Sequence, residues 1–305
     1  MTCLMMCVMI ALSGCKPLVP EDHGLNLYAT FYPIYALTDA LVREIPDMEL
    51  HCLVQPQDSC LRSYELSDWD LHLLKASASA VLMGGRGLEG FEGTLFGLGE
   101  NGPAVSAVLY NLSLYNPTES HANGEGESHF VGANPHLYMS LEGAGQMLGS
   151  LSATLVSLDP GYAERYVENE QAAERAIDAL LEQCRTALAR YAGTRVVLMN
   201  EALIYVAQDY GLEIADWIER ESGTAIYDAE LEQCLERLSR SDAKVILIEK
   251  QAPQRFCEML EVAGYVLARL DIFSTHREGE GFETYLDVQR ENAEALRDAL
   301  QRGDH

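Results

Sequence analysis

The sequence predicts an α/β protein of two doubly wound lobes with parallel sheets, joined by one long backbone helix, with a ligand cleft between the lobes. Apolar β-type runs alternate with helix-type segments in the first half of the chain, and the same alternation recurs in the second half. Between the halves lies a segment of helical composition without an internal break. At 305 residues the chain can form two domains of roughly 100 to 150 residues each.

The expected organisation divides the chain into five parts at changes of composition. They are a lipoprotein signal peptide over 1–15, a tether over 16–24, an N-terminal α/β lobe over 25–158, a linking helix over 159–191 and a C-terminal α/β lobe over 192–305.

The first part is an apolar stretch, MTCLMMCVMIALSGC, that is shorter than the roughly 20 residues needed to span a bilayer. It has the length of the apolar region of a secretory signal. Its end, LSGC, resembles the bacterial lipoprotein box, which implies cleavage before Cys15 and lipidation of that residue. It departs from that pattern because no Lys or Arg precedes Lys16, and a buried strand or helix start is the alternative. We expect a protein anchored by lipid outside the cytoplasmic membrane, in the periplasm or at the cell surface.

Each element of the two lobes is predicted from an apolar run or a helical period. Strands are expected at 25–31, 48–54, 80–83 and 104–109 in the first half, and at 195–199, 213–218, 244–248 and 266–270 in the second. Helices are expected at 32–44, 67–76, 202–210, 228–239, 253–263 and 283–302.

The linking helix is predicted over 160–191, where apolar residues recur at helical spacing and no proline follows the first residue. Asp159 stands at the expected N-cap position. As one helix the segment would be roughly 45 to 50 Å long. Two helices with an undetected break are the alternative.

The charge of the chain argues against one class of partner. The 47 acidic and 21 basic residues give a formal net charge of -26, which repels nucleic-acid phosphates and anionic lipids. Nucleic acid is therefore not an expected partner, although simple solubility also accounts for such a charge.

Polar residues stand at the expected strand ends. Asn200 and Glu201 follow one apolar run directly, Asp271 follows another, and His136 follows the long loop that leaves the last strand of the first lobe. In parallel sheets, ligands bind at the carboxyl ends of the strands. These residues therefore indicate a binding cleft between the lobes.

Six segments in the same order resemble the solute-binding lipoproteins of zinc and manganese ABC transporters. They are FYPIY at 31–35, SYELSD at 63–68, NPHL at 134–137, the stretch 196–211, IERESG at 218–223, and YLDV with REN at 285–292. The resemblance implies two lobes on a rigid helix, a monomer, and a divalent metal ion, zinc or manganese, handed to an ABC permease of the cytoplasmic membrane.

An enzyme is not expected, because the chain has no GxSxG motif and no Ser, His and Asp cluster at strand ends.

The resemblance further implies three histidines and one carboxylate as metal ligands, and this chain retains half of them. His136 matches one histidine and Asp271 the carboxylate, whereas Arg62 and Asn200 stand where the other two histidines belong. Arg62 has no lone pair to offer, would repel a dication and could pair with Asp271. The amide oxygen of Asn200 suits hard cations better than zinc.

Two outcomes stay open for this site. Cys60, Glu65 or Glu201 could supply a substitute ligand and give a weakened or altered metal site. Alternatively, the protein has lost its metal and either binds another small solute, anionic or zwitterionic, through Arg62 or acts as a surface adhesin.

The remaining histidines and cysteines give weaker predictions. His121 and His129 lie in an acidic, glycine-rich loop that could act as an accessory metal scavenger. Surface or internally satisfied positions are expected for His51, His72 and His276, and buried ones for Cys184, Cys234 and Cys257. Cys52 and Cys60 could form a disulfide in an oxidising compartment, and the stretch GGRG at 84–87 is expected to form a tight turn.

Overall fold

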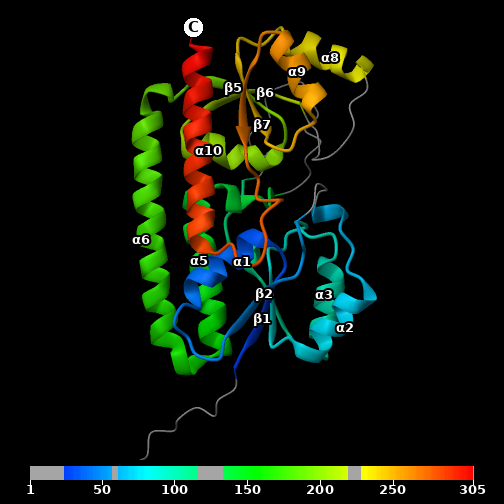
Figure 1. The fold of residues 1–305 in the computed structure, drawn as a ribbon, viewed down its shortest axis with the longest axis vertical. Coiled ribbons are helices and arrows are strands. Elements are labelled where there is room, and N and C mark those ends of the chain that lie inside the picture. Colours follow the sequence, from blue (N-terminus) through cyan, green and yellow to red (C-terminus); the bar gives the residue numbers. More distant parts are fainter. Residues whose placement is uncertain (1–23, 57–60, 116–132, 219–227, 305) are drawn as a thin grey trace, which may run out of the picture.

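A computed structural model of the 305-residue chain describes residues 24–56, 61–115, 133–218 and 228–304. The described residues form two four-stranded parallel sheets, one in each half of the chain (Figure 1). The first sheet has the order β2-β1-β3-β4 and the second the order β6-β5-β7-β8. In each sheet the strand that comes first in sequence has neighbours on both sides, so the winding reverses there. The predicted doubly wound fold is confirmed.

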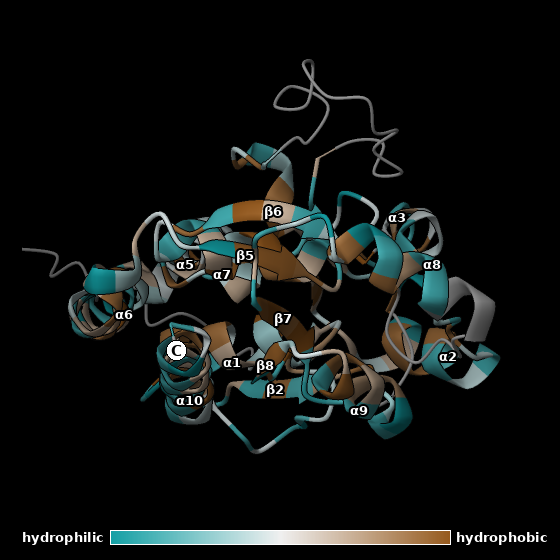
Figure 2. Ribbon diagram, turned by 90° about the horizontal axis from the view of Figure 1, so that it is seen from above, coloured by the Kyte–Doolittle hydropathy of each residue, from teal (hydrophilic) through white to brown (hydrophobic). Residues whose placement is uncertain are grey.

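All eight expected strands form. The first sheet contains β1 (Asn26–Ala29), β2 (Glu49–Cys52), β3 (Ala80–Met83) and β4 (Ala104–Ala107). The second contains β5 (Arg195–Leu198), β6 (Glu213–Trp217), β7 (Val245–Glu249) and β8 (Val266–Leu270). In Figure 2 the central strands β5 and β7 are coloured as apolar and lie inside the molecule, with helices around them.

The helices cover the sheets and agree with the sequence except in two places. Those expected are α1 (Tyr32–Leu41), α2 (Asp68–Ser77), α7 (Ile204–Asp209), α8 (Asp228–Leu238), α9 (Gln254–Val262) and α10 (Phe282–Gly303). The structure adds α3 (Glu92–Gly99) and α5 (Leu141–Leu158), which the sequence does not predict. Both added helices contain several glycines, which have low helix propensity, so packing rather than local preference stabilises them.

The linking segment is one continuous helix. Within it, α6 (Ala163–Leu188) has 26 residues, about 39 Å of helix, and a 3₁₀ turn adjoins each end. It runs beside both lobes (Figure 1) and buries one stripe of side chains, which includes Tyr166, Ile177 and Leu181. Asp159 occupies the expected N-cap position, before the 3₁₀ turn at Pro160–Tyr162, but its side chain makes no capping hydrogen bond and instead accepts one from the Tyr166 hydroxyl, at 3.2 Å.

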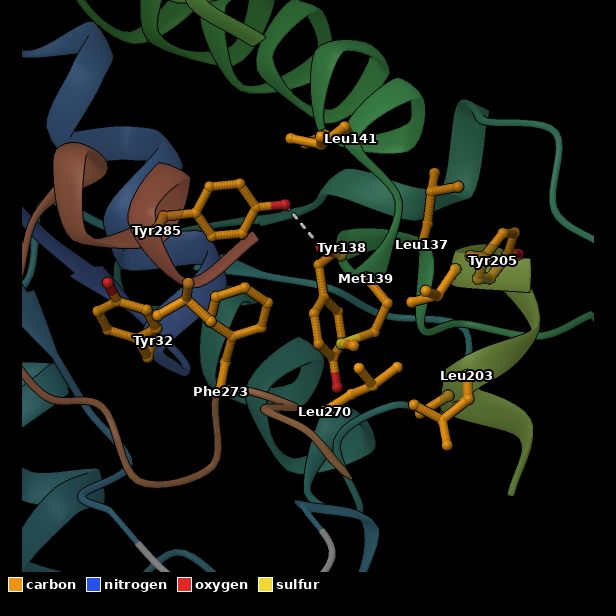
Figure 3. Packing of buried hydrophobic residues seen from close by; sticks show 14 of the residues in the cluster. Tyr32, Leu137, Tyr138, Met139, Leu141, Leu203, Tyr205, Leu270, Phe273 and Tyr285 are labelled. Carbon is orange, nitrogen blue, oxygen red and sulfur yellow. Dashed lines mark hydrogen bonds between the residues drawn. The ribbon is translucent and has the colours of Figure 1, made fainter. Parts of the chain in front are cut away.

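The two lobes are joined by a shared core as well as by α6. Helix α10 follows the last strand of the second sheet but packs against α1 of the first lobe. Its Tyr285 hydroxyl donates a hydrogen bond of 2.6 Å to the carbonyl of Tyr138, and the Tyr285 ring stacks on Phe273 at 4.8 Å (Figure 3). The segment 272–281 after β8 therefore crosses to the first lobe before α10 begins.

A buried carboxylate also links the two lobes through hydrogen bonds. Asp209, at the end of α7, accepts hydrogen bonds from the Ser140 hydroxyl at 2.7 Å and from the backbone N–H of Leu141 at 2.8 Å, where α5 begins. Arg185 of α6 donates to the Asp209 carbonyl at 3.0 Å. Burial raises the pKa of Asp209 to about 6, although the hydrogen bonds from Ser140 and Leu141 oppose the shift.

The four cysteines in the described part of the chain are all buried. Cys184, Cys234 and Cys257 are buried, as expected, and so is Cys52. Cys60 lies outside the described residues, so its pairing with Cys52 stays a prediction. No helix in the described part of the chain is long and apolar enough to cross a membrane.

The raised pKa of Asp209 predicts a pH-dependent stability. Its pKa in the folded state lies above that of an unfolded aspartate, so the stability it contributes is present at low pH and is lost as pH rises through about 6. Relative to Asp209→Asn, the wild type should lose up to roughly 3 kcal/mol of unfolding free energy between pH 4 and pH 7. Urea unfolding at pH 4 and at pH 7 measures this loss of unfolding free energy. Asp242→Asn, at an exposed ion pair with Arg195, is the control, and equal pH slopes for wild type and Asp209→Asn would contradict the assignment.

Candidate metal site between the lobes

The topology of the second sheet gathers polar residues at the carboxyl ends of three neighbouring strands. Asn200 comes soon after β5, Lys250 follows β7, and Asp271 follows β8. The order β5-β7-β8 separates Asn200 from Asp271 by two strand spacings, which is about 10 Å of backbone. The sequence-predicted residues of the second lobe thus share one edge of the sheet.

A residue of the first lobe reaches this edge. Arg62 lies on the 3₁₀ turn Leu61–Ser63, and its Nη2 is 3.1 Å from Oε1 of Glu201. The turn is held close to Gly90, where an added Cβ would lie 2.0 Å from the carbonyl oxygen of Arg62. Nδ1 of His136 lies 3.8 Å from the same Glu201 oxygen. Arg62, Glu201 and His136, which are far apart in sequence, therefore meet between the lobes.

Asn134 fixes the tautomer of His136. The Asn134 amide nitrogen donates to the carbonyl of Glu201 at 2.8 Å, so its amide oxygen faces Nδ1 of His136, at 2.9 Å. This pattern assigns the ring proton to Nδ1 and leaves a lone pair on Nε2. Burial, together with the charge of Arg62, lowers the pKa of His136 to about 3. A neutral imidazole oriented through its second nitrogen is the form that ligates metals.

Both the oxygen and the nitrogen of the Asn200 side-chain amide form hydrogen bonds within the protein. Its oxygen accepts a hydrogen bond of 3.1 Å from the backbone N–H of Ala202 and so caps the turn that follows β5. Its nitrogen donates to the buried carboxylate of Glu249. The amide oxygen that the sequence offers as a ligand is therefore engaged in local structure.

Asp271 is held by a different set of partners from the expected one. The sequence suggests that Arg62 pairs with Asp271, but Arg62 pairs with Glu201, while Lys250 Nζ lies 3.7 Å and His276 Nε2 3.4 Å from Oδ2 of Asp271. Its other oxygen accepts from the backbone N–H of Phe273 at 2.8 Å. Burial raises the pKa of Asp271, but the hydrogen bonds from His276 and Phe273 and the nearby positive charges outweigh it, so the pKa is lowered overall. Asp271 is ionised at neutral pH.

His276 is the site residue that sequence reasoning missed. Both ring nitrogens face carboxylates, as expected of a satisfied histidine, since Nδ1 is 2.8 Å from Oε2 of Glu280 and Nε2 faces Asp271. The hydrogen bond with Asp271 is the largest cause of its raised pKa, with Glu280 contributing. Its only sequence signal is its position five residues after Asp271.

The glycine-rich stretch 84–87 forms the expected turn, and a buried carboxylate stabilises it. Glu89 accepts hydrogen bonds from the backbone N–H groups of Gly84 at 2.7 Å and Gly85 at 2.9 Å, and from the Thr30 hydroxyl at 2.7 Å. These donors are thereby occupied by a side chain of the protein itself, so the turn is structural.

The other residues that the sequence suggests as ligands are not placed with His136, Glu201 and Asp271 by the structure. Within the described ranges, no three or more His, Cys, Asp or Glu side chains are arranged to hold a metal ion. Glu65 is exposed. Cys15, Cys60, His121 and His129 lie outside the described residues. A groove of about 770 Å³ runs between β4 and α5, and its lining, which includes Ser106 and Thr154, belongs to neither the predicted ligands nor their partners.

Two parallel α/β lobes on a common helix, with polar strand ends turned toward each other, define a bilobal solute-binding protein. The chain belongs to the family described as zinc-uptake complex component A, periplasmic, whose model matches residues 27–299.

Individual relatives agree with this membership. The chain is 24% identical over 298 residues to the high-affinity zinc uptake system protein ZnuA of Bacillus subtilis, covering 92% of this chain and 89% of the relative. It is 36% identical over 83 residues to the iron-binding protein YfeA of Yersinia pestis, 27% of each chain.

Solved structures share the fold. The solute-binding protein FpvC of Pseudomonas aeruginosa, in complex with Mn²⁺, has a TM-score of 0.77 at 21% identity, with 92% of this chain and 99% of that chain covered. A mutant of the laminin-binding adhesin of Streptococcus agalactiae has a TM-score of 0.71 at 20% identity, with 91% and 100% covered.

The environment of His136 predicts its ionisation behaviour. With a pKa of about 3, the imidazole should stay neutral from pH 5 to pH 8, with its proton on Nδ1. Imidazole ¹⁵N NMR of the metal-free protein measures both properties, with free histidine in the same buffer as the reference. A His136 signal that titrates between pH 6 and pH 7 would contradict the assigned burial and hydrogen bonding.

Proposed function

We propose that this protein is the extracytoplasmic solute-binding component of an ABC uptake transporter for a divalent metal ion, zinc or manganese, with an altered binding site. The observation that carries the proposal is the state of His136. It is neutral and is oriented by Asn134 so that Nε2 is free of the ring proton, while its Nδ1 lies 3.8 Å from the carboxylate of Glu201. The metal ion is the cargo of the protein and is passed to an ABC permease.

The donor set favours a harder cation than zinc. The proposed ligands are His136, Glu201 and Asp271, which provide one imidazole and two carboxylates, whereas the family pattern has three imidazoles. Oxygen-rich sites suit manganese better than nitrogen-rich ones do. We therefore expect zinc to bind more weakly here than in a three-histidine site, with manganese less affected.

Arg62 must move before Glu201 can bind the cargo. Its guanidinium neutralises the Glu201 carboxylate, but its side chain is 46% exposed, so it can turn into solvent. A dication and a guanidinium compete for the same oxygen atoms, and like charges at this distance repel. The affinity for the metal ion is therefore lowered by the free energy needed to separate Arg62 from Glu201.

The same ion pair favours a second candidate function. If Arg62 stays in place, the protein has lost its metal and either binds an anionic or zwitterionic solute or acts at the cell surface as an adhesin. The fold permits both functions, since the structural neighbours include a manganese-bound solute-binding protein and a laminin-binding adhesin. The metal content of the purified protein distinguishes the metal-binding function from the metal-free one.

We further propose a monomer anchored to the membrane through lipid on Cys15, with 16–24 as its tether. Strand β1 begins at the edge of the first sheet opposite the carboxyl ends that face the interlobe site. An anchor before β1 would therefore leave the binding face free for solute and permease.

Metal binding should stabilise the folded protein and should require His136. After chelator treatment, manganese or zinc at about 100 times its Kd should add about 2.7 kcal/mol to the unfolding free energy and raise the melting temperature. His136→Ala should abolish most of that rise, whereas His72→Ala, at an exposed position on α2, should keep it. Thermal unfolding with and without metal measures the effect. No rise in the wild type would favour the metal-free candidate, and an equal rise in His136→Ala would exclude His136 as a ligand.

A further inference from the structure

We propose that an aromatic face of the first lobe, made of Trp69, Phe96 and Tyr110, docks on the extracytoplasmic loops of the ABC permease. This inference rests on the proposed function, because the permease is the partner that receives the cargo. The part of the permease that covers this face is a protein loop with apolar and positively charged side chains.

The three aromatic side chains are exposed to an unusual degree. Trp69 on α2 is 70% exposed, Tyr110 is 44% exposed and Phe96 on α3 is 42% exposed. Trp is on average highly buried in folded proteins, and Trp and Tyr are enriched among the residues that dominate the binding energy of protein interfaces. The rings of Phe96 and Tyr110 also contact each other edge to face, with centroids 6.0 Å apart. Exposure of this kind indicates a surface that a partner covers.

The aromatic face is held in place by the protein itself. The hydroxyl of Tyr110 donates a hydrogen bond of 2.5 Å to Glu92, and the guanidinium of Arg86 lies over the Tyr110 ring, with Cζ 4.8 Å from the centroid. Trp69 lies in the first turn of α2, which begins with a capping box. Side chains that are already ordered lose little entropy on binding, so they can act as anchors.

The aromatic face lies on the side of the molecule away from the helices that join the lobes. Helices α6 and α10 contact each other on one side, and α2 and α3 lie on the other side in both views (Figures 1 and 2). Within the chain, Trp69 comes shortly after Arg62, whose side chain reaches the interlobe site. A solute leaves that site more readily on the side where no helix joins the lobes. A permease that receives the cargo there is placed to contact the aromatic face.

The charge around the aromatic face determines the chemistry of the partner. Glu65 and Asp68 precede Trp69 and are exposed, and Glu232 of α8 is exposed on the same side of the second lobe (Figures 1 and 2). The formal net charge of the chain is -26. Negative charge of this extent attracts positively charged loops and repels anionic lipid head groups. The exposed aromatic side chains therefore fit a basic protein surface rather than the membrane itself.

The test is the uptake of radioactive Mn²⁺ and Zn²⁺, at limiting metal concentration, by the cells that produce this protein. The gene is deleted and then restored as the wild type or as a variant. Trp69→Ala should lower the uptake rate at least about tenfold, because loss of an anchor side chain weakens docking by about that much. Asp68→Arg should lower the rate as well, because the new positive charge repels a basic loop. Both purified variants should keep the wild-type affinity for the metal, which separates docking from cargo binding.

The matched control is Tyr162→Ala, because Tyr162 is an aromatic residue, 36% exposed, that lies in the 3₁₀ turn before α6. This variant should keep the wild-type uptake rate. If deletion of the gene lowers uptake and Trp69→Ala restores it as fully as the wild type does, this inference is overturned and the proposed function stands. If deletion changes the uptake of neither metal, the proposed function is overturned and the inference with it. Should Trp69→Ala not fold, Phe96→Ala decides the question, since full uptake with that variant also overturns the inference.

Discussion

The interlobe site depends on the ion pair between Arg62 of the first lobe and Glu201 of the second. This pair places a permanent positive charge beside His136, where it helps to keep the imidazole neutral, and it engages the carboxylate of Glu201. The position of Arg62 follows from the close approach of its backbone to Gly90, which leaves no space for a side chain there. A positively charged side chain is thus part of the fold at the site that we propose for the metal ion.

The surroundings of this pair are rigid because the chain crosses between the lobes several times. The loop after β8 reaches α1 before α10 begins, Tyr285 of α10 bonds to Tyr138, and Asp209 joins α7 to the start of α5. Movement of side chains such as Arg62 and Lys250 therefore requires less rearrangement than movement of whole lobes. We infer that cargo binding is controlled mainly by exchange of ion-pair partners.

The sequence predicts the architecture well, because alternating apolar runs and an unbroken helical period are local signals. It does not predict α3 and α5, whose glycines give no helical preference and which form only when packed in the tertiary structure. For the site, the positions of His136 and Asp271 after strands are visible in the sequence, but the partner of Arg62 is not. That partner depends on which carboxylate the folded chain brings within reach, and the contact of His276 with Asp271 depends in the same way on how the loop after β8 is folded.

The most direct test of this account is the metal affinity of Arg62→Ala, compared with the wild type and with the charge-conserving control Arg62→Lys. If the guanidinium competes with the cargo, its removal should increase affinity for Mn²⁺ at least about tenfold, since one positive charge near a dication costs more than about 1.4 kcal/mol. The control should remain close to the wild type. An affinity of Arg62→Ala equal to or weaker than that of the wild type would contradict the central role assigned to the ion pair.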